Sequence, residues 1–215
     1  MNVKSNLTLY AIVRNDYRKS TFSIKSTKTL GHVIIETESG CGNTVSDNYN
    51  NYVTRFYNKA PYVFTASKMN FVGSTNYIKT WGSDSAGMTY GRSVGYRGID
   101  IQCPSSYSDY YLKTIVHEMT HAWDSYFYAK TGQYLSGKSD VQALLNKYKK
   151  SSKKPLRDYS YSSQFEFVAD MYAWYYFIYI DPTYQPAVVR SNTYYPSDMK
   201  KVMEKYISIA KNGYK

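Results

Sequence analysis

Histidine, cysteine and long apolar runs are all scarce in this sequence, and each scarcity excludes a class of protein. The 215 residues include only two cysteines, Cys41 and Cys103, too few for a small domain built on disulfides. No apolar run approaches the ~18–20 residues of a membrane-spanning helix, so we expect no membrane span. Hydrophobic residues make up 43% and aromatic residues 18% of the chain, which is enough to bury a core and to exclude global disorder.

Acidic residues are also few, and the charge balance bears on partners. There are 16 acidic and 27 basic residues, so the net charge is +11, and tyrosine alone contributes 27 residues. A basic, tyrosine-rich surface can bind nucleic acid through phosphates and stacking, or it can meet an acidic polymer, cell-wall surface or acidic protein. The densest basic stretches, Lys147–Lys150 and Lys153–Lys154, are too short for a nucleic-acid stripe. We therefore disfavour nucleic acid and keep an acidic surface or partner open.

The first residues, Met1–Asn6, lack the apolar segment of a signal peptide. Two explanations stay open: the protein is intracellular, or it is exported and its signal has been removed. A disulfide between Cys41 and Cys103 would suit an exported protein, and two free thiols are equally compatible with the sequence.

The N-terminal half has the pattern of strands with one helix, and the C-terminal half has the pattern of helices alone. Residues rich in β-branched and aromatic side chains predict strands at Leu7–Arg14, Thr21–Thr27, His32–Thr37, Tyr62–Thr65 and Ile99–Cys103. Pro104 stops the last of these, which we place at a sheet edge. Apolar spacing predicts helices at Tyr49–Phe56, Ser108–Lys130, Ser139–Lys149, Ser162–Ile180 and Ser197–Lys211. We expect one α+β domain over 1–215, with an N-terminal lobe of about 1–105 and a helical lobe of about 106–215.

One short motif carries metal chemistry: His117-Glu118-Met119-Thr120-His121, within a predicted helix. Residues at i and i+4 share a helix face, so the two imidazoles can bind one zinc ion. Glu118 can then face a metal-bound water as a general base. The alternative is a triplet that is merely solvated or packed in the core. We disfavour it because apolar flanks bury this helix on more than one side, where ionisable groups are costly without a metal.

The third metal ligand is expected to be a carboxylate, because no histidine follows His121. Only Glu166 and Glu204 lie downstream among the glutamates. Glu204 belongs to a lysine-rich amphipathic helix, whereas Glu166 lies in a segment that is apolar nearly all round. We therefore choose Glu166. Asp170 follows one turn later on the same face, where it can accept the second ring N–H of a ligating histidine.

Three stretches together carry a family resemblance: His117–Asp124, Tyr159–Asp170 and the aromatic run Met171–Phe177. They resemble the anthrax lethal factor-like zinc peptidases, a group that includes the secreted Pro-Pro endopeptidases. The segment Tyr195–Met199, which enters the last predicted helix, is also similar. The resemblance covers about half the chain, from Ile99 to Asn212, and the N-terminal portion matches no family we can name.

The resemblance implies a role for each position of the motif. The ligands of a single zinc ion are His117, His121 and Glu166, with Glu118 as the general base. Tyr159 falls where the family has a tyrosine that donates to the oxyanion, a contribution on the order of 2–4 kcal/mol. Tyr161 lies close by as a competitor for that role. Asp124 is implied as structural support for the site.

Two departures from the family leave the substrate preference open. The family often has a glutamate where Asp170 stands, and its cleft-lining loop is matched only loosely by Ala86–Arg92. An extended peptide substrate would pair with the edge strand predicted at Ile99–Cys103 by β-addition.

The sequence and the resemblance together predict a zincin-like α+β fold with zinc between a twisted sheet and a helical part. The predicted function is a zinc-dependent endopeptidase that acts on an extended protein or peptide, and the resemblance favours secretion. Two other classes remain. A catalytically inactive, zinc-bound, toxin-like binding module is disfavoured by the intact Glu118 and by Tyr159. A polyanion binder with a structural zinc is disfavoured because such sites are usually closed, four-ligand and cysteine-rich.

Overall fold

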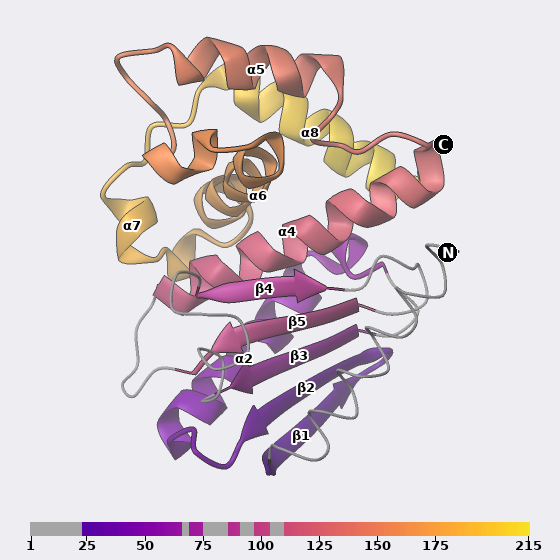
Figure 1. Ribbon diagram of the computed structural model, residues 1–215, viewed down its shortest axis with the longest axis vertical. Helices are drawn as coiled ribbons and strands as arrows, with labels where there is room; N and C mark the ends of the chain where they lie inside the picture. Colours follow the sequence, from indigo (N-terminus) through magenta and orange to yellow (C-terminus); the bar gives the residue numbers. More distant parts are fainter. Residues whose placement is uncertain (1–22, 66–68, 75–85, 91–96, 104–109) are drawn as a thin grey trace, which may run out of the picture.

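The computed structural model describes residues 23–65, 69–74, 86–90, 97–103 and 110–215. A five-stranded mixed sheet lies at one end of the molecule, and the helices of the C-terminal half lie at the other end (Figure 1). Helix α4 (Tyr110–Thr131) runs between them. The expected α+β class is therefore confirmed. The strand predicted at Leu7–Arg14 lies outside the described residues.

The sheet has the order β1-β2-β3-β5-β4. Its strands are β1 (Ile24–Leu30), β2 (Val33–Glu38), β3 (Met69–Ser74), β4 (Gly87–Tyr90) and β5 (Arg97–Gln102). β2, β3 and β5 are parallel, while β1 and β4 pair antiparallel at the two edges. The strand predicted at His32–Thr37 is confirmed as β2, and the one predicted at Thr21–Thr27 is found as β1, displaced toward its C-terminus.

The prediction that Ile99–Cys103 forms an edge strand is wrong. β5 lies inside the sheet, where Asp100 is paired with Val72 of β3 on one side and with Met88 of β4 on the other. Ile99 is fully buried, as expected of an inner strand. A proline two residues beyond the end of a strand in the sequence carries no information about the neighbours of that strand, so it could not place β5 in the sheet.

The strand predicted at Tyr62–Thr65 is also wrong. Pro61–Val63 form a short 3₁₀ turn, η1, directly after α2 (Asn43–Lys59). Pro61 suits the first position of such a turn, because its fixed φ is helical and its missing N–H would have no partner there. Val63 and Phe64 are buried, so the apolar run reflects core packing rather than a sheet.

The remaining helices lie on the side of α4 away from the sheet (Figure 1). They are α5 (Ser139–Lys149), α6 (Gln164–Tyr175), α7 (Ala187–Arg190) and α8 (Ser197–Lys211). Of these, α6 packs against α4, and α5 and α8 pack against α6. Shorter helical turns lie between them: η2 (Asp158–Tyr161), the π-helical η3 (Tyr176–Ile180) and η4 (Pro182–Tyr184). The helix predicted over Ser162–Ile180 is thus α6 extended by η3. None of the described helices is long and apolar enough to cross a membrane.

One buried cluster of apolar side chains joins the sheet to the helices. It includes Ile35 and Phe71 from the sheet, Trp123 from α4 and Trp174 from α6. A disulfide links Cys41, which precedes α2, to Cys103, which follows β5, with a Cα–Cα distance of 6.0 Å. The packing of α4 on β4 and β5 sets the position of the sheet beneath α4, while the cross-link ties the loop before α2 to the end of β5.

Candidate metal centre

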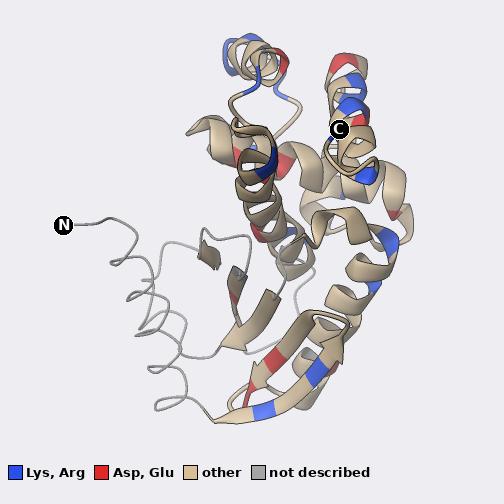
Figure 2. Cartoon of the chain, turned by 90° about the vertical axis from the view of Figure 1, so that its right-hand side faces the viewer, with Lys and Arg blue, Asp and Glu red and all other residues tan. Residues whose placement is uncertain are grey.

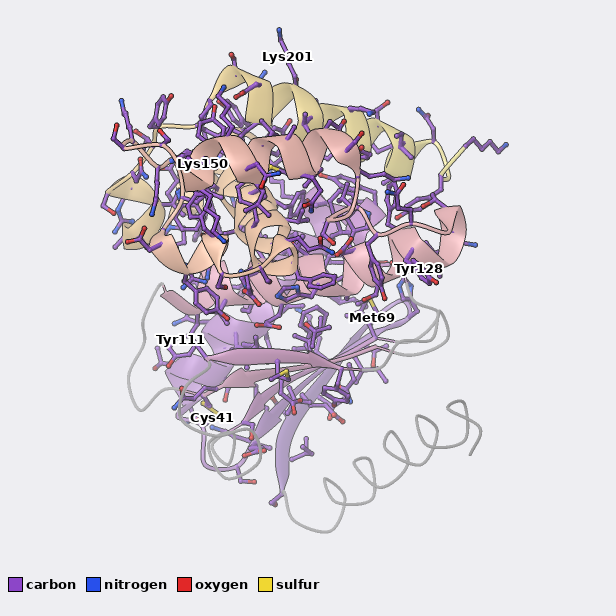
Figure 3. The ribbon with its side chains drawn as sticks, turned by 45° about the horizontal axis from the view of Figure 1, so that its top comes forward. Cys41, Met69, Tyr111, Tyr128, Lys150 and Lys201 are labelled. Carbon is purple, nitrogen blue, oxygen red and sulfur yellow. A yellow bond between two sulfur atoms is a disulfide. The ribbon has the colours of Figure 1, made fainter. Side chains whose placement is uncertain are left out.

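Helix α4 brings His117, Glu118 and His121 together within two turns. The ligating atoms of these three side chains all lie within 4.8 Å of one another, and the Nε2 atoms of the two histidines are 3.2 Å apart. Figure 3 labels Tyr111 and Tyr128, which lie near the two ends of α4, and the cluster lies on the helix between them. The i, i+4 spacing sets this proximity, because side chains one turn apart stack on the same face of a helix.

Helix α6 adds Glu166 to the same point. Its Oε2 atom lies 2.9 Å from Nε2 of His117, and its Oε1 atom lies 3.5 Å from Nε2 of His121. The hydroxyl of Ser163 caps α6 by accepting a hydrogen bond from the backbone N–H of Glu166, which places this side chain in the first helical turn. Glu166 Oε2 is buried and makes no hydrogen bond of good geometry with the described residues. A buried, unsatisfied carboxylate oxygen beside two imidazole nitrogens fits a divalent cation.

The protonation states of Glu166 and His121 suit metal binding. Burial alone would raise the pKa of Glu166, but the neighbouring His117 and His121 lower it below its ordinary value. The carboxylate is therefore ionised near neutral pH. Burial lowers the pKa of His121, so its imidazole is neutral there and keeps a lone pair for a cation.

The outer nitrogen of His117 is bound by Asp170, as the sequence predicted for that carboxylate. The distance from Nδ1 to Asp170 Oδ1 is 2.6 Å. Asp170 is fully buried and also binds the side chains of Arg157, Ser160 and Lys113. Its burial would raise its pKa, but the charges of His117 and Lys113 hold that pKa well below its usual range. An ionised Asp170 accepts the Nδ1–H of His117 and turns Nε2 toward Glu166.

Strand β4 holds Glu118 from the side of the sheet. The hydroxyl of Thr89 lies 2.9 Å from Glu118 Oε2 and 2.6 Å from the backbone oxygen of the same residue. This close approach requires glycine at position 87, since a Cβ there would lie 2.7 Å from Glu118 Cγ and 2.8 Å from Thr114 Cγ2. The edge strand is thereby pressed against α4 beside Glu118.

The two candidate tyrosines of η2 face opposite environments. Tyr159 is 52% exposed, and its pKa is raised by partial burial and by the negative charges of Glu166 and Glu118. Its phenol is therefore protonated at neutral pH. Tyr161 is buried, with its ring 5.7 Å from that of Phe167, and burial raises its pKa to about 12.

Three further ionisable residues have their described partners outside the metal cluster. They are Asp124, Glu204 and His32. Asp124 Oδ1 accepts a hydrogen bond of 3.0 Å from the backbone N–H of Ser136, which ties the later part of α4 to the turn that follows it. Burial raises the pKa of this carboxyl. Glu204 pairs with Lys200 on the surface of α8, and His32 binds the carbonyl of Phe64.

Four residues around the cluster were not found from the sequence: Thr89, Lys113, Arg157 and Ser160. Lys113 precedes His117 by one helical turn, so the predicted helix already placed the two side chains on the same face. Thr89 falls within the loosely matched segment Ala86–Arg92. Arg157 and Ser160 carried no signal, because each acts through a contact with Asp170 that only the folded chain creates.

The basic residues of the helical end are interleaved with acidic ones. Figure 2 shows lysine and arginine scattered with aspartate and glutamate over the helices furthest from the sheet. On α5 and α8, Lys147 pairs with Asp198 and Lys205 pairs with Asp140. These pairings place acidic side chains beside two of the lysines on these helices.

No protein-family model matches this chain, and no curated protein matches it in sequence. The functional conclusion therefore depends on the residues and geometry of the cluster.

Proposed function

We propose that this chain is a zinc-dependent endopeptidase with a zincin-like fold, in which His117, His121 and Glu166 hold one zinc ion. The observation that carries the proposal is the convergence of two imidazole nitrogens and a buried, unsatisfied carboxylate oxygen from α4 and α6. Two histidines and a glutamate are a known catalytic zinc set that leaves a fourth position for water or substrate.

The roles of the surrounding side chains follow from their contacts. When bound, zinc supplies a Lewis acid that polarises the scissile carbonyl and lowers the pKa of water. The Thr89 hydroxyl lies at Glu118 Oε2, so Oε1 is the atom that takes a proton from the attacking water and returns it to the leaving amine. The phenol of Tyr159 donates to the carbonyl oxygen as negative charge develops there. Asp170 keeps His117 in one tautomer and one orientation.

The substrate surface we propose is the edge of β4. β4 is one of the two edge strands of the described sheet, and it packs against α4 beside Glu118. An extended peptide that adds to this edge would pass the cluster with its backbone paired to the sheet. This placement replaces the earlier expectation of pairing with Ile99–Cys103, since β5 is covered by β4 on that side.

Secretion and an acidic partner are also proposals. The disulfide between Cys41 and Cys103 suits an oxidising compartment, and this supports export. The net charge of +11 favours an acidic surface or partner.

Metal content and peptide cleavage test the proposed function together. We expect elemental analysis to find about one zinc ion per chain. Glu118→Ala should keep that zinc, because Glu118 is not a ligand, and should lose at least ~10²-fold in cleavage of a peptide library. Glu204→Ala removes a glutamate from the surface of α8 and is the matched control, with zinc and activity unchanged.

Two outcomes would contradict the proposal. Full zinc content in a chain that carries both His121→Ala and Glu166→Ala would show that these two residues are not zinc ligands. A parent protein that binds zinc but cleaves nothing across the library would instead support the inactive binding module.

A further inference from the structure

The turn that presents Tyr159 is fastened to Asp170 on both sides of the tyrosine. Arg157, two residues before it, donates from Nε to Asp170 Oδ2 at 2.6 Å. Ser160, the residue after it, donates from its hydroxyl to the same oxygen at 2.6 Å. The other oxygen, Oδ1, lies 2.6 Å from His117 Nδ1. One buried carboxylate therefore contacts a proposed metal ligand and both flanks of the proposed oxyanion donor.

Arg157 also contacts the ring of Tyr159 directly. Its Cζ atom lies 4.7 Å from the centre of that ring, within the range of a cation–π contact. The guanidinium thus contacts Asp170 through Nε and lies over the ring of Tyr159. A planar guanidinium can make both contacts at once, whereas the compact ammonium of lysine cannot reproduce them together.

We propose that Arg157 is a positioning residue that sets the phenol of Tyr159 relative to His117. Arg157 contacts the ring of Tyr159, and Arg157 and His117 both bind Asp170. This proposal rests on the proposed function, because it concerns the placement of the oxyanion donor against the metal site. Tyr159 is 52% exposed, so packing against the core does not by itself fix the orientation of its ring. A contact with Arg157 restricts the rotation of that ring. A donor held in advance stabilises developing charge without reorganisation at the moment of reaction.

A fluorine measurement tests the positioning without depending on zinc or on activity. The full chain is prepared metal-free with 3-fluorotyrosine at position 159, and its ¹⁹F resonance is compared in the parent, Arg157→Met, Arg157→Lys and Lys154→Met. Lys154 pairs with Asp158 on the same segment, so Lys154→Met removes one nearby positive charge and is the matched control. We expect the resonance to move in Arg157→Met, to move less in Arg157→Lys, and to stay in place in Lys154→Met.

A resonance that does not move in a folded Arg157→Met protein would overturn the proposal. So would an equal movement in Lys154→Met, because the effect would then be one of charge rather than of contact. Circular dichroism checks the fold of each variant, and Arg157→Lys supplies the test if Arg157→Met does not fold.

Kinetics test the consequence for the reaction. Arg157→Met should lower kcat by ~10–100-fold, the usual scale for losing an outer partner of a metal site, with KM little changed. In a Tyr159→Phe background the same substitution should cost several-fold less, because the phenol it positions is already gone. An equal loss in both backgrounds would overturn the coupling. If the parent cleaves nothing, the proposed function fails, and the fluorine result alone decides whether Arg157 positions Tyr159.

Discussion

At the scale of single residues, the two tyrosines of η2 lie in different surroundings although only one residue separates them. Tyr159 is 52% exposed, and the charge of Glu166 contributes to its raised pKa, while Tyr161 is buried in the core against Phe167. The sequence placed both within reach of the same role. The exposure of Tyr159 supports it, rather than Tyr161, for the proposed role of oxyanion donor.

Tyr159→Phe is therefore expected to lower kcat by roughly 10–10³-fold with little change in KM, because the phenol acts on charge that develops only in the transition state. Zinc content should be unchanged, since phenylalanine keeps the ring. The measurement is steady-state cleavage of one peptide substrate by both tyrosine variants.

Tyr161→Phe is the matched comparison and should leave kcat within a factor of about two, because the side chain is buried against Phe167 and cannot reach a bound substrate. A large loss of kcat in Tyr161→Phe with no loss in Tyr159→Phe would assign the role of oxyanion donor to Tyr161 instead. No loss in either would show that another group stabilises the oxyanion.

At the scale of elements, α5 and α8 are joined by two reciprocal contacts. Asp140 in the first turn of α5 accepts hydrogen bonds from Lys205 and Tyr206 of α8. Asp198 in the first turn of α8 accepts from Lys147 and Tyr148 at the end of α5. The two helices lie alongside each other above α6 (Figure 1), and each carries the acid at its start and the donors further on. This arrangement favours their antiparallel packing.

These contacts predict a pH dependence of stability. Partial burial raises the pKa of Asp140 and of Asp198, but their lysine and tyrosine donors outweigh it and lower both values. A lowered folded pKa means that the stabilisation is complete above the unfolded value of about 3.9 and is lost as the pH falls through the folded value. Combining Asp140→Asn with Asp198→Asn should therefore lower Tm at pH 7 by about 1–5 °C, a small effect because the pairs are partly exposed and screened.

Thermal unfolding of the parent and this double variant between pH 2 and pH 7 checks the prediction. The difference in Tm should shrink below pH ~4 as the parent carboxyls take up protons. Asp158→Asn is the control, because Asp158 is highly exposed and pairs within its own segment. A difference that stays constant down to pH 2 would contradict the assignment.

At the scale of the whole molecule, the disulfide links the loop before α2 to the end of β5, across 62 residues of sequence. That interval contains α2, η1, β3, β4 and β5, so the cross-link closes a loop around most of the sheet. Constraining a loop of this length lowers the entropy of the unfolded chain.

Replacing both cysteines by serine should reduce the free energy of unfolding by about 2–4 kcal/mol. Zinc content should stay the same, because neither cysteine belongs to the metal cluster. Urea unfolding of the parent and the double variant measures the loss, and the parent in excess reductant should behave like the variant. Equal unfolding free energies in oxidised and reduced parent would show that the cross-link does not form.

The sequence by itself determined those features that depend on neighbours within one or two helical turns. The i, i+4 spacing of His117 and His121 brings their nitrogens together, and apolar periodicity placed α5 and α8 at their observed bounds. The choice of Glu166 and Asp170 also came from the sequence, since few carboxylates lie in apolar surroundings downstream. For His117 and His121, helix geometry alone converts spacing into contact, whereas the contacts of Glu166 and Asp170 with His117 also required α6 to pack against α4.

Only the tertiary structure decided the features that join distant segments. β4 precedes β5 in the chain yet lies outside it in the sheet, so the edge facing Glu118 is Gly87–Tyr90 and not Ile99–Cys103. The contacts of Thr89 with Glu118 and of Arg157 with Asp170 likewise arise from packing between separate elements. The physical reason is that strand order and interhelical contacts depend on which apolar faces are buried together across the whole chain, and local spacing carries no record of that choice.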